Sequence, residues 1–261
     1  MGQGEHQFTN RPLANAEIQP LGYLIGLQFH APIKLIHAKG LEFAAKLSAH
    51  VDAPRGLDLQ ENQWTFSQPL GAAPQGKFQV LVRESQLVLE AEFPTHPLEW
   101  FEHRYEFILS EFQKMFTPGL LLTSSASIRG TLQVDGDARV FLTTYVTKLE
   151  ERRLSPLGRP LHLFGIRLVM PPFQEQQPPT GKRKKAKIVR TVDWVADVKA
   201  ESLLEDTRKL FLEATGQWPT PKQWDDKATK SVVDQLGIVY GFMKNNLVPF
   251  LTAESRGGDA Q

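Results

Sequence analysis

A cluster of cationic side chains lies between residues 182 and 190 of this 261-residue chain. Its members, here called the basic cluster, are Lys182, Arg183, Lys184, Lys185, Lys187 and Arg190. Grouped lysine and arginine side chains bind phosphate backbones without reading base sequence. Since no aromatic residue is interleaved with them, base stacking is not indicated. The cluster predicts a site for nucleic acid or another polyanion, and a merely solvated loop is the alternative.

Polar side chains alternate with apolar ones along residues 120–134, which is the period of a half-exposed strand. The polar positions include Ser127, Arg129, Thr131 and Gln133. If helices cover the opposite face of the sheet, this row faces water or a partner. We expect these four residues to contact a polar macromolecular partner, and an ordinary wet sheet face is the alternative.

The histidines do not have the spacing of a metal site. His30 and His37 are seven residues apart, as are His96 and His103, and prolines lie within both intervals or beside them. A pair of ligands on one helix face needs a spacing of three or four residues. Cysteine is absent, so thiolate ligands, disulfides and a cysteine nucleophile are excluded. We predict no metal and no cofactor.

Catalytic motifs are missing as well. The sequence contains no Gly-x-Ser-x-Gly elbow and no glycine-rich phosphate loop. The carboxylate pair Glu90 and Glu92 shares a predicted wet strand face, where it serves solubility. The pair best placed for a nuclease or RNA-processing site is His162 with Arg167. We predict no catalytic residue and keep the nuclease as a remote alternative.

Aromatic residues gather on one stripe of the helix predicted at 98–116. Phe101, Tyr105, Phe112 and Phe116 share this stripe, with Trp100 beside it. The stripe either fills a core against a sheet or lines a cavity for an apolar small molecule.

Hydrophobic periodicity and turn signals divide the chain into alternating strands and helices. Strands are predicted at 21–29, 63–67, 78–82, 87–93, 120–134, 161–170 and 187–201. Helices are predicted at 38–51, 98–116, 138–149, 202–214 and 222–247. Ser202 and Glu205 fit a capping box for the fourth helix, and Gly216 fits its C-terminal cap.

This order indicates an α+β protein whose antiparallel sheets carry long helices on one face. It resembles a duplicated helix-grip or TBP-like unit, with the order β-α-β-β-β-α. The expected organisation is a tail at 1–18, a first half at 19–118, a second half at 119–252 with the basic hairpin loop at 171–187, and a tail at 253–261.

Composition limits the classes of partner. Hydrophobic residues make up 41% and charged residues 23%, which is typical of a globular protein. With 30 basic against 29 acidic residues, the net charge is +1, so any polyanion site must be local. No secretory signal or membrane-spanning stretch is apparent, so we expect a cytoplasmic protein without a membrane partner.

These observations together favour a non-enzymatic binding or assembly protein. It would act through the polar sheet face and the basic hairpin loop on a macromolecular partner, protein or nucleic acid. Self-association through the apolar stripe of the last helix stays open. The main alternative is a cavity-type protein that binds an apolar small molecule.

Overall fold

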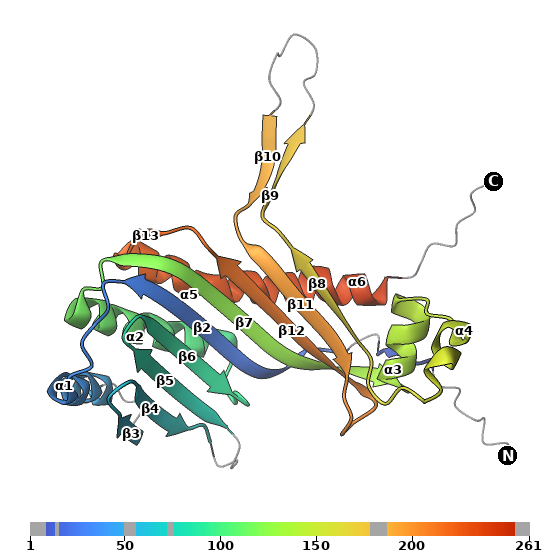
Figure 1. Cartoon of the computed structure of the whole chain (residues 1–261), viewed down its shortest axis with the longest axis horizontal. Coiled ribbons are helices and arrows are strands. Elements are labelled where there is room, and N and C mark those ends of the chain that lie inside the picture. The colour runs from blue at the N-terminus through green and yellow to red at the C-terminus, as the bar shows by residue number, and fades with distance from the viewer. Residues whose placement is uncertain (1–8, 14–15, 50–55, 72–75, 178–186, 254–261) are drawn as a thin grey trace, which may run out of the picture.

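The computed structural model describes residues 9–13, 16–49, 56–71, 76–177 and 187–253. It shows a mixed α+β fold built on one large antiparallel sheet (Figure 1). The order of the main strands across this sheet is β3-β4-β5-β6-β2-β7-β12-β11-β8. In chain order they are β2 (Gln19–His30), β3 (Gly56–Leu59), β4 (Trp64–Pro69), β5 (Lys77–Arg83), β6 (Gln86–Glu92), β7 (Leu120–Asp135), β8 (Gly165–Met170), β11 (Val195–Ser202) and β12 (Lys209–Trp218).

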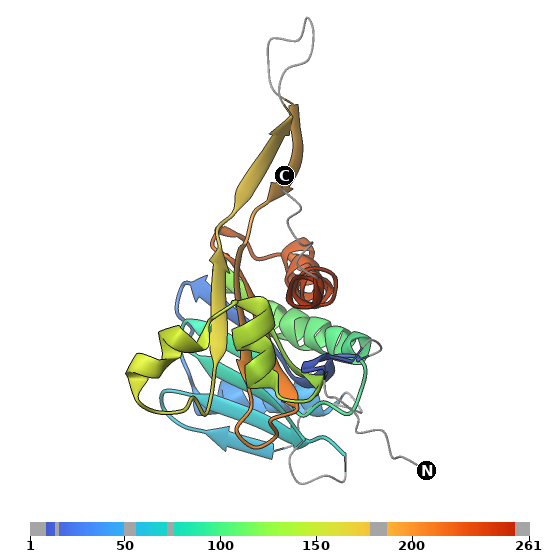
Figure 2. The ribbon, with the colours of Figure 1, turned by 90° about the vertical axis from the view of Figure 1, so that its right-hand side faces the viewer.

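Helices cover one face of this sheet. The two long ones, α2 (Leu98–Phe116) and α5 (Asp226–Phe242), lie on the same side in Figure 2. The others are α1 (His37–Ser48), α3 (Ala138–Val140), α4 (Glu151–Leu154), α6 (Val248–Thr252), the π-helices η1 (Phe141–Val146) and η3 (Met243–Leu247), and the 3-10 turn η2 (Ser155–Leu157). In the described part of the chain, none of the helices has the length and hydropathy that a membrane span requires.

The core forms between this helical layer and the sheet because both elements bury one apolar face. On the central strand β2, Tyr23, Ile25 and Leu27 point toward the helices and are buried. The Phe101 ring of α2 lies 5.2 Å from the Tyr23 ring. The buried hydroxyl of Tyr105 donates a hydrogen bond to the carbonyl oxygen of Tyr23, at 3.0 Å.

Several predicted elements are confirmed. The helix predicted at 98–116 coincides with α2, and the long strand predicted at 120–134 is β7. The predicted hairpin is formed by β5 and β6, with Arg83 paired to Gln86 across the turn. These segments have strong periodicity and clear turn residues, so local sequence is enough to identify them.

The helix predicted at 202–214 is wrong. Residues 209–218 form the strand β12, which pairs with β7 on one side and β11 on the other. Ser202 does not cap a helix, because its Oγ bonds the backbone nitrogen and oxygen of Phe164 at 3.0 and 3.3 Å. Gly216 is buried within β12 and is not a helix C-cap.

Other boundaries also need correction. The helix predicted at 138–149 ends at Val146, and most of it is the π-helix η1. The predicted N-terminal tail contains a short strand, β1 (Arg11–Pro12), which pairs with β7. Another two-residue strand, β13 (Lys222–Gln223), also pairs with β7, so the last helix begins later than predicted.

The segment predicted as the basic hairpin loop, 171–187, begins and ends in a two-stranded ribbon, and its residues 178–186 lie outside the described residues. Its strands are β9 (Phe173–Gln177) and β10 (Lys187–Val192), which pair with each other and form a separate sheet. In both views the ribbon projects from the body of the protein beyond β8 and β11 (Figures 1 and 2).

Candidate functional site

The face of the sheet opposite the long helices carries a row of alternating charges. Arg129 on β7 lies between two carboxylates, one from the adjacent strand β12 and one from β6, which lies beyond β2. Its Nε donates to Glu213 of β12 at 3.0 Å, and its Nη1 lies 3.7 Å from a carboxylate oxygen of Glu90 on β6. Lys199 of β11 continues the row, with its Nζ 3.7 Å from Glu213. The charges of this row are therefore neutralised within the sheet.

Charged side chains at the outer edge of this face are paired as well. Arg167 on the edge strand β8 donates from Nε to Asp197 of β11 at 2.8 Å. This hydrogen bond holds the pKa of the Asp197 carboxyl below its ordinary value, so the pair is ionised at neutral pH. Such exposed pairs contribute little to stability, but they balance the charge of the surface.

The four residues predicted to face a partner do lie on this side, but not as a freely accessible row. Ser127 and Thr131 are buried among neighbouring strands, and Ser127 Oγ lies 2.9 Å from Thr215 Oγ1. Arg129 and Gln133 are partly exposed. Ser127 and Arg129 of β7 thus bond side chains of the adjacent strand β12.

Part of the basic cluster belongs to the projecting ribbon. Lys187 and Arg190 are residues of β10, although their side chains lie outside the described part of the structure. Lys182, Arg183, Lys184 and Lys185 lie in the connection between β9 and β10, which is also outside the described residues. The described strands place both ends of this connection at the far end of the ribbon (Figure 1).

The residues considered for a nuclease are not brought together. Arg167 is paired with Asp197 on the open face of the sheet. His162 lines a small cavity of about 130 Å³ with Asp137 and Ser202. That set could suggest a Ser-His-Asp site, but Ser202 Oγ is bonded to the backbone of Phe164, and Asp137 caps α3 by accepting from Arg139 and Val140 nitrogens. These groups are used for structure.

Acidic and histidine side chains of the described residues do not gather into a metal site. Within the described ranges, no group of three or more His, Cys, Asp and Glu residues has the arrangement of a metal centre. Burial raises the pKa of the Glu102 carboxyl, and the nearby carboxylates of Glu99 and Asp234 add to this effect. These three residues belong to the two long helices, far along the chain from the basic cluster.

The aromatic stripe of α2 packs into the core. The ring of Phe112 lies 5.6 Å from Phe29 and 5.7 Å from Trp224, and Phe78 stacks on Tyr105 at 5.7 Å. Trp100 lies under the Arg104 guanidinium at 4.4 Å. These rings fill the space between helix and sheet.

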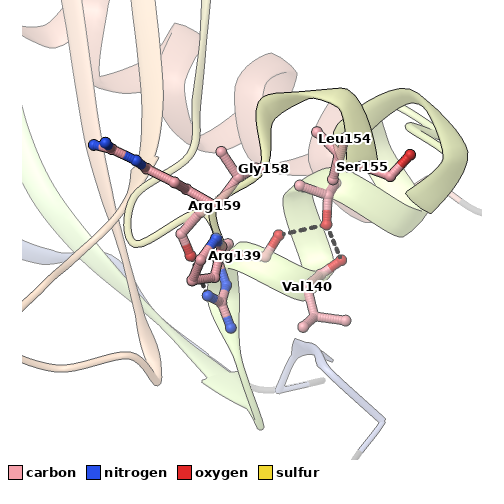
Figure 3. A pocket seen from close by; sticks show the side chains of 9 residues that line it. Arg139, Val140, Leu154, Ser155, Gly158 and Arg159 are labelled. Atoms are coloured by element: carbon pink, nitrogen blue, oxygen red, sulfur yellow. Dashed lines mark hydrogen bonds between the residues drawn. The ribbon is translucent and has the colours of Figure 1, made fainter.

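A wide depression of about 540 Å³ lies beside α3 and the α4–η2 turn (Figure 3). Two arginines line it, but in Figure 3 the Arg159 side chain extends away from that of Arg139. Arg139 is held by Asp137 and by the carbonyl oxygen of Leu161. The Thr143 hydroxyl donates to the carbonyl of Arg139 at 2.9 Å. The depression therefore lacks converging groups for an anion or a reaction.

An apolar cavity that sequence reasoning missed lies at the base of the ribbon. Its volume is about 270 Å³, and it is lined by residues of β8, the ribbon, β11, α5 and η3, together with the short segments beside those strands. Trp194 and Phe242 contribute aromatic walls. The only sequence signal was a pair of tryptophans, Trp194 and Trp218, whose packing depends on β11 and β12 being neighbours.

Comparison with known proteins does not assign the chain to a group. No protein-family model matches this sequence, and no curated protein matches it in sequence.

Proposed function

We propose that this protein is a non-enzymatic binding protein that holds a nucleic-acid phosphate backbone with the basic cluster on its ribbon. The observation that supports it most is the contrast between the two cationic surfaces. Arg129, Lys199 and Arg167 are neutralised by carboxylates of adjacent strands. Between residues 176 and 189, by contrast, the sequence has five cations of the basic cluster and no aspartate or glutamate, while the sixth, Arg190, is the register partner of Glu175 on β9.

The ribbon holds both ends of the connection that contains residues 182–185 away from the body of the protein. A two-stranded ribbon alone is marginally stable in water. Strands β9 and β10, of five and six residues, form such a ribbon as a sheet separate from the large one. Unbalanced positive charge at its far end attracts a polyanion and releases counterions on binding. Such contacts carry no sequence information, so we expect binding with little base preference.

The test is binding of labelled mixed-sequence duplex DNA and single-stranded RNA, followed by fluorescence anisotropy at several salt concentrations. Replacing Lys182, Arg183, Lys184 and Lys185 together with alanine is expected to weaken binding at least tenfold at low salt. The slope of log K against log salt is expected to become shallower by roughly 2 to 4, because about 0.9 ion is released per phosphate contact on duplex DNA.

A matched control removes the same charge elsewhere. Lys34, Lys39, Lys227 and Lys230 are exposed and lie away from the ribbon, on the β2–α1 connection, α1 and α5 (Figure 1). Replacing these four with alanine changes the net charge equally and is expected to leave affinity nearly unchanged. Equal losses in both variants, or none in either, would remove the basic cluster from the function.

We also propose that the two halves are an internal duplication. Outward from the central pair, the strand order is β2-β6-β5-β4 on one side and β7-β12-β11-β8 on the other. Each set is followed in the chain by a long helix, α2 or α5. Superposing residues 19–118 on 119–252 tests the idea, because it requires β2 to fall on β7 while α2 falls on α5.

A further inference from the structure

The cavity at the base of the ribbon, here called the ribbon-base cavity, has walls that are already ordered. Trp194 stacks on Trp218 with ring centroids 5.3 Å apart and an angle of 21° between the planes. Phe242 of α5 meets the Trp194 ring edge-on at 5.5 Å. Phe173 at the start of β9 and Ile238 of α5 complete the mouth, exposed by 47% and 46%. A ligand would meet aromatic surfaces that already pack on one another in this structure.

A glycine keeps one wall open. Gly241 lies within α5, where glycine is less favourable than alanine. A Cβ atom at this position would meet only the side-chain nitrogen of Asn245 among the described residues, at 4.0 Å. Packing within the protein therefore does not require glycine here, whereas a side chain would fill the cavity.

One end of the cavity is polar without being charged. Asn245 and Asn246 line it, and both belong to the π-helix η3. A π-helix within an α-helix is uncommon and occurs often at functional sites. The described lining residues carry no ionisable side chain, while the two amides offer both hydrogen-bond donors and acceptors. This chemistry suits a neutral, apolar ring with one polar group.

We propose that the ribbon-base cavity binds a flat aromatic group of about bicyclic size that carries one hydrogen-bonding atom, of which indole is the simplest example. A cavity of about 150 Å³ accepts benzene, and drug-sized ligands need about 300 Å³ or more. The 270 Å³ found here lies between these limits. The group belongs either to a free small molecule or to a tryptophan side chain of a peptide.

The experiment titrates indole into the full-length protein by isothermal calorimetry, with melting temperature as a second readout. Indole is expected to bind and to raise the melting temperature, because it stabilises only the folded state. Gly241→Leu, which places a side chain in the cavity, is expected to weaken binding at least tenfold. Lys230→Leu adds a leucine to an exposed position of the same helix and is expected to bind as the wild type does.

If Gly241→Leu does not fold, Ile238→Asp replaces it, since a carboxylate at the exposed mouth is also expected to weaken indole binding at least tenfold. Absence of indole binding to the wild type overturns the proposal, and so does binding that neither cavity variant weakens. The alanine variant of Lys182, Arg183, Lys184 and Lys185 should bind indole normally, so this result is independent of the proposed phosphate binding.

A second pair of titrations distinguishes the sources of the ring. N-acetyltryptophanamide and a short peptide with an internal tryptophan are compared with free indole. Tighter binding of the peptide than of indole identifies a peptide side chain as the ligand. Binding of indole with exclusion of the peptide identifies a free small molecule.

Discussion

Side chains that could do chemistry are mostly committed to structure in this protein. Arg129 and Arg167 are paired with carboxylates of neighbouring strands, and Ser202 is bonded to a backbone segment. The buried Arg104 guanidinium lies between the rings of Trp100 and Phe78, at 4.4 and 4.9 Å, and donates to Gln68 at 2.6 Å. These groups are hydrogen-bonded or ion-paired within the fold, whereas the buried Oε1 atoms of Gln113 and Gln235 accept no hydrogen bond in the described structure.

The hydroxyl of Tyr105 is a buried polar group whose contribution to stability can be measured alone. Tyr105→Phe removes the buried hydroxyl that donates to the carbonyl oxygen of Tyr23. We expect the free energy of unfolding to fall by about 1 kcal/mol, the usual net contribution of one such hydrogen bond. Urea denaturation measures the change. Tyr145→Phe, at a ring that is 41% exposed, is the control and should change stability by less than about 0.5 kcal/mol.

Individual elements owe their identity to partners as much as to their own residues. The segment that forms β12 has leucines and a phenylalanine that fit a helical stripe, and a plausible cap precedes it. In the structure Leu210, Leu212 and Ala214 alternate into the core, because β7 and β11 supply hydrogen-bond partners on both sides. Pairing with distant strands outweighs a weak local helix preference.

A substitution at Gly216 distinguishes the predicted helix at 202–214 from the observed strand β12. A Cβ atom there would lie 2.7 Å from two ring carbons of Trp218 and 2.8 Å from Val239 Cγ2 of α5. Gly216→Ala is therefore expected to lower the free energy of unfolding by about 1 to 3 kcal/mol through overpacking. Gly241→Ala is the control, and it is expected to raise the free energy of unfolding by roughly 0.5 to 1 kcal/mol. Gly241 lies in a helix, where alanine is more favourable than glycine, and a methyl group there has open space. Stabilisation by Gly216→Ala would contradict the observed packing of β12.

The whole molecule is joined through the pairing of β2 with β7. These antiparallel strands run beside each other from the pair Gln19 and Thr131 to the pair His30 and Leu120, and the apolar core is continuous across them. The two halves therefore share one sheet and one core. Neither half completes its sheet alone, because each would expose a long central edge.

A shared core implies cooperative unfolding of the two halves. Far-UV circular dichroism and tryptophan fluorescence are expected to give coincident denaturation curves in urea. Trp64 and Trp100 report on the first half, Trp194 and Trp218 report on the second, and Trp224, which stacks on Phe112 of α2, reports on the contact between them. Two separated transitions would show that the halves are independent domains, contrary to the continuous sheet.

Local sequence was enough to predict the long helix 98–116, the hairpin turn near Arg83 and the alternation along 120–134. Each has a strong period bounded by proline, glycine or polar turn residues, so neighbours along the chain determine it. The polar side of the sheet also followed from pattern, whereas residues 182–185 of the basic cluster lie outside the described residues.

Tertiary structure alone decided the rest. It made residues 209–218 a strand, paired the charges of Arg129 and Arg167, and brought Trp194 beside Trp218 and Phe242. These outcomes depend on segments many residues apart that become neighbours in one sheet. A periodic pattern specifies which face of an element is buried, but the partner that buries it is chosen by the fold as a whole.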